Sequence, residues 1–443
     1  MRPTTVMLYA TSAELIGTVA DHLDSFSKYS KYETIKIDSR VADNELFGFE
    51  GFASIVIHYS VVISSTNYIS KKLRDKIRKF NGPKVLFIQD EMRWVERTVD
   101  SIIDLGIDCV FSVIDKETRE FVYQDKRLKG VRFETTLTGF VPEHLTRLET
   151  PNYRERLIDI GYRARKLPAC YGSFAQEKWQ IGRKFLSDSK KFGLECDIST
   201  EESDRHYGQD WIKFLSNCKA TLGVESGSSF IDYSGKVFPQ VMKYEADHPE
   251  ASFREVADLF LEGRDGQTTI RAISPRCFEA AALRTLMIMY EGSYSGVLNA
   301  GEHYVKLERD HSNMEEVVAI LKDHGRAQEI ISHTYQDVAC SGKWSLKSFI
   351  RHFDDVLSEE IKKKNNEIQA YTRDLMSEKT KNEKKLKAHK LNQYRRRKDI
   401  IVRRLYEIIS RFEKQSANAL PTSISKMLVK TRKRISVFLS HYL

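Results

Sequence analysis

Short apolar runs and amphipathic segments alternate along the first 150 residues of the chain. Apolar runs bounded by polar residues predict buried strands, and apolar residues at helical spacing predict helices. The alternation indicates a doubly wound, mostly parallel sheet that fills residues 1–150. The predicted strands are Val6–Tyr9, Thr34–Asp38, Ser54–His58, Lys84–Gln89 and Cys109–Val113, and the predicted helices are Ser12–Leu23, Tyr68–Phe80 and Val95–Leu105.

A second alternation of the same kind follows a linker at Thr150–Pro151 and predicts another α/β domain over residues 151–350. The segment Asp232–Gly266 interrupts it with an irregular pattern, and we interpret this segment as an insertion with one helix after Pro249. The other predicted strands and helices of this domain alternate as they do in the first domain. They are strands Leu157–Tyr162, Leu194–Ile198 and Ala220–Val224, and helices Gln176–Phe185, Asp210–Cys218, Met314–His324 and Arg326–Cys340.

The stretch Ile273–Asp310 organises this second domain. Arg276 and Glu279 open a helical turn, the apolar run Leu286–Tyr290 predicts a strand, and a Gly/Ser-rich loop precedes another strand at His303–Leu307. Helix, strand, loop and strand with polar residues at the joints is the way in which α/β domains build nucleotide sites. The pattern therefore predicts a nucleotide site in this stretch.

From Leu346 the pattern is helical, and from Glu359 it becomes long and charged, which predicts a basic helical extension over residues 351–443. Residues 361–443 hold 23 Lys and Arg against 7 Asp and Glu, whereas the whole chain holds 71 against 62. The rest of the chain is therefore mildly acidic, and an anionic partner is expected to contact the extension.

Three partners suit such an extension: nucleic acid, a coiled-coil partner or an anionic membrane. Aromatic residues are sparse between the charges and no nucleic-acid-reading motif is present, so we expect no nucleic acid. Ile424–Leu443 has the cationic and apolar faces of an interfacial helix. We expect contact with a membrane surface or a partner helix, and the alternative is a solvated helical hairpin packed on the body.

Composition sets further bounds. At 443 residues with 41% hydrophobic content, the chain predicts two folded domains and an appendage. Six scattered cysteines without a CxxC pair indicate free thiols in a reducing compartment. The N-terminus has little of a signal peptide, and no run of about 18 apolar residues predicts a membrane span. We expect a cytoplasmic protein at the inner face of the membrane.

Four blocks together carry a family resemblance: Tyr162–Gly172 (YRARKLPACYG), Gly223–Ser229, Ser274–Ala280 and His333–Tyr335. The chain resembles the group 1 glycosyltransferases, most closely a bacterial branch that builds surface polysaccharides of the lipopolysaccharide and O-antigen type. This resemblance covers about Leu157–Asp354 and implies the GT-B architecture, in which two Rossmann-like domains face a cleft. The N-terminal half is similar only in its general pattern.

The resemblance implies roles for several residues of the second domain. Glu279 matches the glutamate that binds the ribose hydroxyls of the nucleotide, although a glutamate near a helix N-terminus also complements the helix dipole. Arg163, Arg165 and Lys166 stand where the family places cations against the diphosphate, Arg163 being preferred, and the alternative for them is a solvated loop. Arg276 could reach phosphate or pair with Glu279.

The glycine-rich loop and one missing residue complete this comparison. Tyr294, Ser295 and Gly296 stand where the family's loop faces the phosphates, and backbone amides of such loops bind phosphate oxygens. The family's pattern has two glutamates separated by seven residues, the first of which touches the donor sugar. Here Arg271 stands eight residues before Glu279, so that glutamate is missing, and Glu225 is the candidate to replace it.

In the N-terminal half, His58 and the pair Asp90–Glu91 end predicted parallel strands and are expected to face the interdomain cleft. Any of them could act as the base toward an acceptor hydroxyl if the reaction inverts configuration. If it retains configuration, they would only hold the acceptor, and a lone histidine there is as often structural. No Asp-x-Asp occurs in the chain, so we predict neither a metal nor a cofactor besides the donor substrate.

The sequence thus predicts a metal-independent glycosyltransferase that moves a sugar from a nucleotide-sugar donor to a hydroxyl of a glycan or lipid-linked glycan. The alternative from another class is a non-catalytic scaffold in a polysaccharide assembly complex, which the missing glutamate favours. A sugar-nucleotide epimerase of the same fold class lacks a clear catalytic set here.

Overall fold

The structure is a computed structural model that describes residues 2–10, 17–43, 47–364 and 385. By compactness the chain divides into two units, Met1–Asn44 with Phe52–Tyr371, and Glu45–Gly51 with Thr372–Leu443. Both sheets belong to the first unit. Within the described ranges, none of the helices is both long and apolar enough to span a membrane.

The first sheet is entirely parallel and has six strands in the order β2-β1-β3-β4-β5-β6. Its order reverses between β1 and β3, which is the switch point of a doubly wound sheet, where ligands bind beyond the carboxyl ends of the strands. The central strands are fully buried because apolar side chains fill both of their faces. The strands are β1 (Thr4–Tyr9), β2 (Glu33–Asp38), β3 (Ser54–Ile57), β4 (Lys84–Ile88), β5 (Cys109–Ser112) and β6 (Arg132–Thr135).

Helices connect these strands, and local capping residues set where several of them begin. The Ser70 hydroxyl accepts the Leu73 N–H at the start of α3, and the Asp115 carboxylate accepts the Thr118 N–H at the start of α5. The helices of this part are α1 (Gly17–Tyr29), α2 (Ser39–Ala42), α3 (Lys71–Lys79), α4 (Val95–Leu105), α5 (Lys116–Val122) and α6 (Glu143–Thr146).

The second sheet repeats the same topology with five parallel strands in the order β13-β12-β9-β7-β8. Its switch point lies between β7 and β9. Two apolar clusters flank it, one holding Ile160, Leu222 and Ile330, the other Phe278, Met287 and Tyr304. The elements are β7 (Ile158–Arg163), β8 (Cys196–Ser199), β9 (Cys218–Gly223), β12 (Leu286–Tyr290) and β13 (Val305–Leu307), with α7 (Gly172–Asp188), α8 (Gly208–Ser216), α11 (Pro275–Ala282), α12 (Met314–Lys322) and α13 (His324–Thr334).

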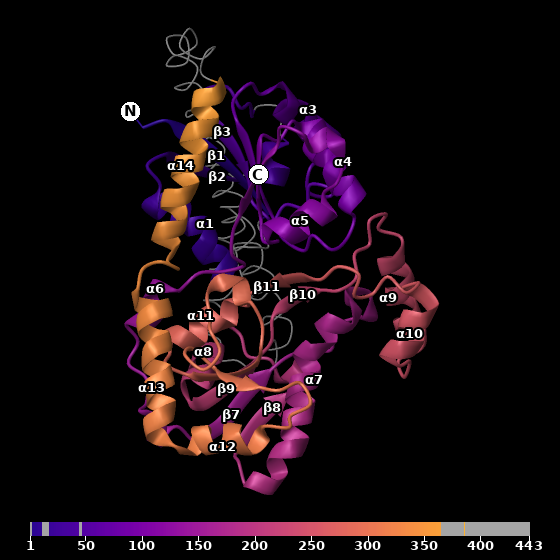
Figure 1. Ribbon diagram of the computed structural model, residues 1–443. Coiled ribbons are helices and arrows are strands. Elements are labelled where there is room, and N and C mark those ends of the chain that lie inside the picture. The colour runs from indigo at the N-terminus through magenta and orange to yellow at the C-terminus, as the bar shows by residue number, and fades with distance from the viewer. Residues whose placement is uncertain (1, 11–16, 44–46, 365–384, 386–443) are drawn as a thin grey trace, which may run out of the picture. The chain divides into compact units, whose positions relative to one another are not determined.

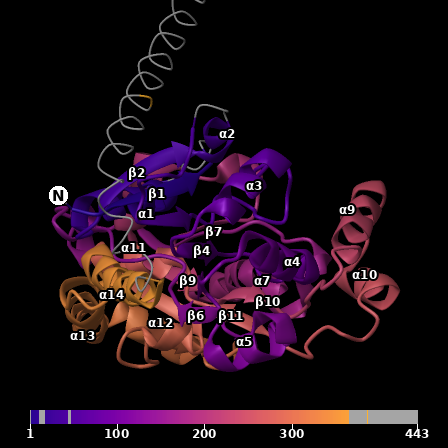
Figure 2. The same ribbon diagram turned by 90° about the horizontal axis from the view of Figure 1, so that it is seen from above.

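The predicted insertion carries two helices instead of one. An antiparallel pair, β10 (Ser226–Ser228) and β11 (Ile270–Ala272), closes its base. Between these strands α9 (Val237–Asp247) and α10 (Phe253–Phe260) lie side by side (Figures 1 and 2). The extra helix is α9, which starts before Pro249 and buries only one face.

The last described helix, α14 (Leu346–Lys364), packs against the first sheet and not the second (Figure 1). Phe349 and Phe353 meet Phe26, Phe87 and Phe111 in one aromatic cluster, with ring centroids 4.9–6.5 Å apart. Helix α14 therefore completes the core of the N-terminal sheet, and the predicted boundary between residues 350 and 351 falls inside it. Apart from Lys385, the rest of the predicted extension lies outside the described residues, including Ile424–Leu443, as does the predicted helix start at Ser12.

The two Rossmann-like sheets confirm the predicted fold class, an α/β chain of the GT-B kind. The alternation of helix, strand, loop and strand in Ile273–Asp310 is also confirmed, with α11, β12 and β13 in that order.

Candidate functional site

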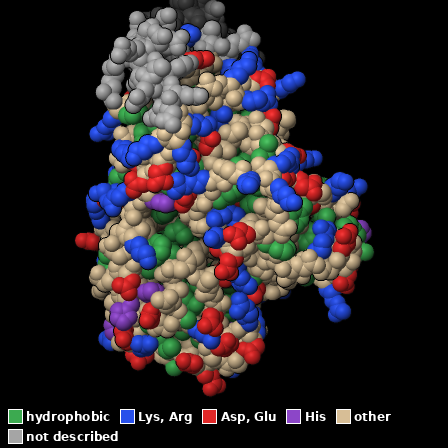
Figure 3. All heavy atoms as spheres, turned by 45° about the horizontal axis from the view of Figure 1, so that its top comes forward, with side chains coloured by type: hydrophobic (Ala, Val, Ile, Leu, Met, Phe, Trp, Pro, Cys, Tyr) green, Lys and Arg blue, Asp and Glu red, His purple; other side chains and the backbone are tan. Residues whose placement is uncertain are grey.

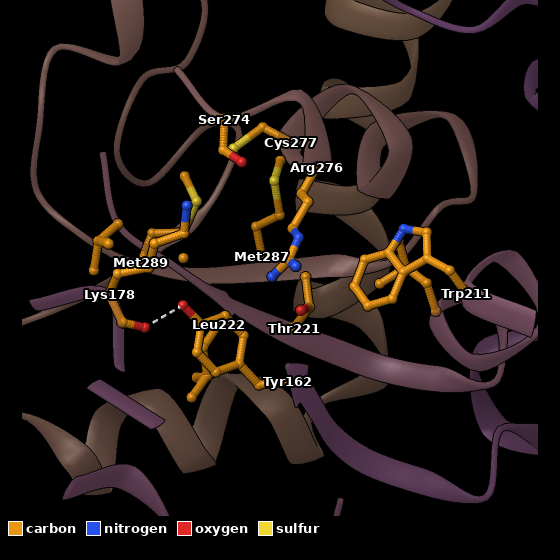
Figure 4. A pocket seen from close by; sticks show the side chains of 13 residues that line it. Tyr162, Lys178, Trp211, Thr221, Leu222, Ser274, Arg276, Cys277, Met287 and Met289 are labelled. Atoms are coloured by element: carbon orange, nitrogen blue, oxygen red, sulfur yellow. Dashed lines mark hydrogen bonds between the residues drawn. The ribbon is translucent and has the colours of Figure 1, made fainter. Parts of the chain in front are cut away.

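A small cavity lies at the carboxyl end of the second sheet, where α11 begins (Figure 4). Strands β7, β9 and β12 supply Tyr162, Thr221 and Met289 to its wall, and helices supply Lys178 from α7 and Trp211 from α8. Its volume of about 20 Å³ is enough for one water molecule. Any larger ligand therefore occupies its mouth or widens it.

Arg276 reaches into this cavity from the first turn of α11, and Figure 4 shows its guanidinium pointing toward Thr221. Its Nη1 donates to the backbone carbonyl of Arg163, and its guanidinium lies 4.9 Å from the ring centre of Trp211. Among the described residues it has no carboxylate within ion-pair distance. Arg276 is thus held in position by neutral groups, and none of the described carboxylates neutralises its charge.

Glu279, one turn further along α11, is held by Trp211, whose indole N–H donates to its Oε2 over 2.8 Å. Burial raises the pKa of the Glu279 carboxyl, while the Trp211 bond and nearby Arg276 lower it and Asp21 of α1 raises it. The second carboxylate oxygen has no protein donor in the described chain. Glu279 can therefore accept hydrogen bonds from the hydroxyl groups of a ligand.

Lys178 was missed by the sequence reasoning. It lines the cavity from α7, and its ammonium makes no hydrogen bond or ion pair within the described residues. Burial, together with the neighbouring cations Arg276 and Arg165, lowers the pKa of Lys178 to about 8. The sequence could have pointed to Lys178 because it is a lysine on the predicted helix Gln176–Phe185, which borders the predicted phosphate region.

Arg163 lies at the end of β7 as predicted, but its guanidinium is 7% exposed and all five of its N–H groups have protein acceptors. They go to the carbonyls of Tyr162, Asp197 and Asp204, to the Asp197 carboxylate at 2.7 Å, and to the His206 ring. This placement argues against a phosphate-binding role for Arg163 and makes it a brace between β7, β8 and the loop that follows β8.

Arg165 and Lys166 fit the predicted role better. Both are exposed on the loop that leaves β7, and neither has an ion-pair partner among the described residues. Arg165 is close enough to Lys178 to help lower the pKa of the lysine. Free cations near the cavity are thus supplied by Lys178, Arg276 and this loop.

Glu225, the candidate to replace the missing glutamate, forms an ion pair with Arg271, which stands at the position of that glutamate. Arg271 Nη1 lies 3.1 Å from Glu225 Oε2, and the Glu225 side chain is 2% exposed. The other oxygen, Oε1, accepts the Ser293 hydroxyl at 2.7 Å and the Tyr294 N–H at 2.9 Å. Glu225 thus fastens the glycine-rich loop to the second sheet, and its oxygens are occupied by the protein.

The predicted phosphate loop is braced by internal bonds. The side chain of Tyr294 is fully buried, and its hydroxyl donates to the Tyr290 carbonyl at 2.5 Å. The Ser295 hydroxyl accepts the Ile273 N–H, and the Gly296 N–H donates to the Ser293 carbonyl. Tyr294, Ser295 and Gly296 all have positive φ angles of 42° to 71°. The loop has a fixed shape, but its Tyr294 and Gly296 amides already have acceptors.

A larger hollow of about 330 Å³ lies at the carboxyl ends of β3 and β4 in the first sheet. Asp90 lines it, is exposed, and takes a left-handed backbone with a φ of 56°. Arg93 and Trp94 border the same hollow, with the guanidinium 4.7 Å from the Trp94 ring centre. A carboxylate, a cation and an aromatic face together suit a polyhydroxylated ligand.

The other two predicted catalytic residues are turned inward. His58 is fully buried, its Nδ1 accepts the Ser60 N–H, and its Nε2 lies 3.0 Å from Nδ1 of His22. Burial and the neighbouring His22 lower the pKa of His58 well below its usual value. This environment argues against His58 as a base and favours the structural alternative.

Glu91 borders the hollow but is only 3% exposed, and its carboxylate accepts from Ser112, Tyr123 and the Val113 N–H. Burial raises its pKa to about 7, although these donors lower it. Of the three predicted catalytic residues, Asp90 alone presents its side chain to solvent.

Backbone pairing ties the loop after β4 to the segment after β10. The Trp94 N–H donates to the Asp232 carbonyl at 2.9 Å, and the Asp232 N–H donates to the Met92 carbonyl at 2.8 Å. Gly235 has a φ of 75°, and a Cβ there would lie 1.7 Å from the Trp94 ring. The wall of the hollow beyond β3 and β4 is therefore connected to the domain that carries Arg276 and Glu279.

Within the described part of the chain, no group of three His, Cys, Asp or Glu side chains is arranged to hold a metal ion. Basic and acidic side chains are interspersed over the face shown in Figure 3.

No family model matches the sequence, and no curated protein matches it. Solved structures share features of the fold at low identity. They include HepE of Anabaena in complex with UDP and glucose, with 8% identity over 81% of this chain and all of that one and a TM-score of 0.46. An alpha-glucosyltransferase in complex with UDP has 11% identity over 80% of this chain and 99% of that one, with a TM-score of 0.46. TarM has 12% identity over 69% of this chain and a TM-score of 0.42, and this chain spans about half of its length (54%).

Proposed function

We propose that this protein transfers a sugar from a nucleoside diphosphate sugar to a hydroxyl of a glycan acceptor. The observation that carries the proposal is a pair of cations, Arg276 and Lys178, at the carboxyl end of a Rossmann-like sheet. Neither has an ion-pair partner among the residues that the structure describes. Beside them lies Glu279, a carboxylate held in place by Trp211.

In the proposed reaction the bond between the sugar carbon and the diphosphate oxygen breaks, and a bond to the acceptor oxygen forms. The acceptor hydroxyl gives its proton to a base such as Asp90 if the reaction inverts configuration, and to the leaving diphosphate if it retains configuration. Negative charge grows on the diphosphate as it leaves, so cations fixed beforehand lower the barrier. Arg276 and Lys178 would fill this role from the cavity, with Arg165 and Lys166 from the loop. Glu279 would accept hydrogen bonds from the ribose hydroxyls.

We assign the acceptor to the hollow beyond β3 and β4, where Asp90 would accept a hydrogen bond from the reacting hydroxyl. The sequence blocks around Tyr162–Gly172 and Ser274–Ala280 support a lipid-linked bacterial surface glycan as the acceptor class. The basic residues 361–443 would then hold the enzyme at an anionic membrane. The second candidate is a non-catalytic scaffold, which the engagement of Arg163 and Glu225 by the protein itself favours.

Calorimetric titration with UDP, GDP, ADP and CDP tests the donor site. We expect at least one diphosphate to bind, and we expect Arg276→Gln and Lys178→Gln to bind it roughly tenfold more weakly or worse, because each loses a charged hydrogen bond. Lys190→Gln, an exposed lysine just after α7, is the matched control and should bind as the wild type does. If none of the diphosphates binds, the transferase proposal is wrong and the scaffold is favoured.

The membrane assignment is tested by vesicle flotation. The full chain should float with vesicles containing anionic lipid. A chain ending at Lys364 keeps α14 intact but should not float, because it lacks the basic residues beyond that helix. Equal flotation of the two proteins would contradict the assignment.

A further inference from the structure

A third hollow, of about 500 Å³, lies away from both sites, at the amino end of the second sheet. Its wall consists of the linker 146–153, which joins the two sheets, together with Arg156, Arg284 and Gln328. None of these residues has a role in the proposed transfer reaction.

The charge of this hollow is unbalanced. Arginines 147, 156 and 284 line it against a single acid, Glu149. Arg147 is engaged by Glu143 at 2.6 Å, but neither Arg156 nor Arg284 has a carboxylate within ion-pair distance in the described chain. Uncompensated cations around a water-sized or larger space favour an anion.

Arg156 is 3% exposed and is held by neutral acceptors alone. Its guanidinium donates to the carbonyls of Pro151, Cys218 and Leu283 and to the Thr285 hydroxyl, which uses four of its five N–H groups. Burial, with a further contribution from nearby Arg284, lowers the pKa of Arg156 to about 10. One N–H of Arg156, which lines the hollow, thus has no acceptor among the described residues.

Arg284 is fixed in position, although none of the described carboxylates pairs with it. It follows the end of α11 with a left-handed φ of 53°, and its guanidinium lies 3.8 Å from the ring centre of Tyr335. Tyr335 begins a π-helical turn and donates its hydroxyl to the Thr146 carbonyl in the wall of the hollow. A non-glycine residue in this backbone region and a π turn are both features that occur often at binding sites.

We propose that this hollow binds a small phosphate-bearing anion, held by Arg284 and by the free N–H of Arg156. A guanidinium presents paired donors in the plane that suits phosphate oxygens. Such a ligand joins the linker between the two sheets to the end of α11, the helix that carries Arg276 in its first turn and Glu279 at its middle.

Calorimetry with pyrophosphate tests the site in a protein that already carries Arg276→Gln, so that the proposed donor site contributes little. In this background, Arg284→Gln should weaken binding roughly tenfold or more, because it removes a charged donor pair. Arg154→Gln removes the same charge from an exposed linker residue that does not line the hollow, and it should leave affinity unchanged. Equal affinity in the two variants would overturn the proposal.

A measurement on the unmodified protein covers the case in which Arg284→Gln does not fold. Phenylglyoxal labels accessible arginines, and mass spectrometry reports each position separately. Saturating pyrophosphate should slow labelling of Arg284 several-fold and leave Arg154 unchanged, and labelling of Arg284 at an unaltered rate would refute the site. Neither assay measures sugar transfer or diphosphate nucleotide binding, so the two proposals fail independently.

Discussion

Arg276 donates a hydrogen bond to the backbone carbonyl of Arg163, yet the charges of the two side chains are in different environments. Arg163 is surrounded by carbonyls and the Asp197 carboxylate, so its charge is neutralised and its position is structural. Arg276 stacks on Trp211 and keeps donors for a ligand. At the residue scale, the number of donors already satisfied by the protein decides which cation is available for binding.

Two buried titratable groups beside the first sheet, His22 in α1 and Glu91 after β4, have opposite effects on stability as the pH changes. Burial lowers the pKa of His22 to about 3 and raises that of Glu91 to about 7. Below pH 6.5 the unfolded state protonates His22 and the folded state does not, so the free energy of unfolding falls as the pH falls. Between pH 4.5 and 7 the folded state holds a proton on Glu91 that the unfolded state lacks, so this contribution rises as the pH falls.

Urea unfolding between pH 6.5 and 4.5 separates the two contributions. Relative to the wild type, His22→Phe should lose stability less steeply with falling pH, by about 1.4 kcal/mol per pH unit. Glu91→Gln should lose it more steeply by a similar amount. Identical slopes in all three proteins would show that neither group changes its pKa on folding.

At the scale of elements, α14 is the part of the chain whose position its own sequence does not reveal. Its apolar stripe predicts a helix that starts at Leu346, and the structure confirms that helix. Polar bonds also anchor it, including Ser30 to Asp354 at 2.6 Å and Lys364 to Asp108 at 2.8 Å. These partners are hundreds of residues away, so the pattern alone could not assign the helix to the first sheet.

Removing one aromatic ring from the contact between α14 and the first sheet tests how much this contact stabilises the protein. Phe353→Ala should lower the free energy of unfolding by about 3–5 kcal/mol, because Phe353 is 1% exposed within the aromatic cluster. Phe121→Ala is the matched control, since Phe121 is 44% exposed, and it should change stability by less than about 0.5 kcal/mol. Chemical denaturation of both proteins gives the comparison, and similar losses would mean that α14 adds little to the core.

The same reasoning explains which elements could be predicted. Leu286–Tyr290 is a continuous apolar run and forms β12 with the predicted bounds, because a central parallel strand is buried on both faces. The edge strand β6, Arg132–Thr135, has a polar sequence and a half-exposed pattern, so no apolar run marked it.

The candidate site could be predicted as far as it depends on the local pattern, which places Arg276 and Glu279 in a helix before a strand; their binding roles stay predictions. It was not predictable where long-range contacts decide the environment. Arg163 is engaged by residues 34 to 43 positions away, and the pKa of Lys178 is lowered by burial and by cations from other segments.

At the scale of the whole molecule, two sheets with the same strand order present their carboxyl ends with different chemistry. The second offers cations and Glu279, and the first offers Asp90 beside Arg93 and Trp94. This difference between the two sites suits the proposed two-substrate reaction, in which an anionic donor and a neutral, polyhydroxylated acceptor are held by separate domains.

If Arg276, Lys178 and the loop cations supply the positive charge that the leaving diphosphate needs, transfer should not require a divalent ion. We expect the initial rate of transfer, measured with the donor found by titration, to be unchanged after dialysis against EDTA. Arg276→Gln should lower kcat by about 10²–10³-fold under the same conditions. A rate that EDTA abolishes and Mg²⁺ or Mn²⁺ restores would contradict this mechanism.

The return of α14 to the first sheet has a consequence for the order in which the protein is made. Residues 158–307 contain every strand of the second sheet, so that sheet can pair as soon as they leave the ribosome. The first sheet is synthesised earlier, but Phe87 and Phe111 lack their cover until residue 364 has emerged. The domain that is translated first is therefore the one that is completed last, and its aromatic core is the surface that chaperones would meet during synthesis.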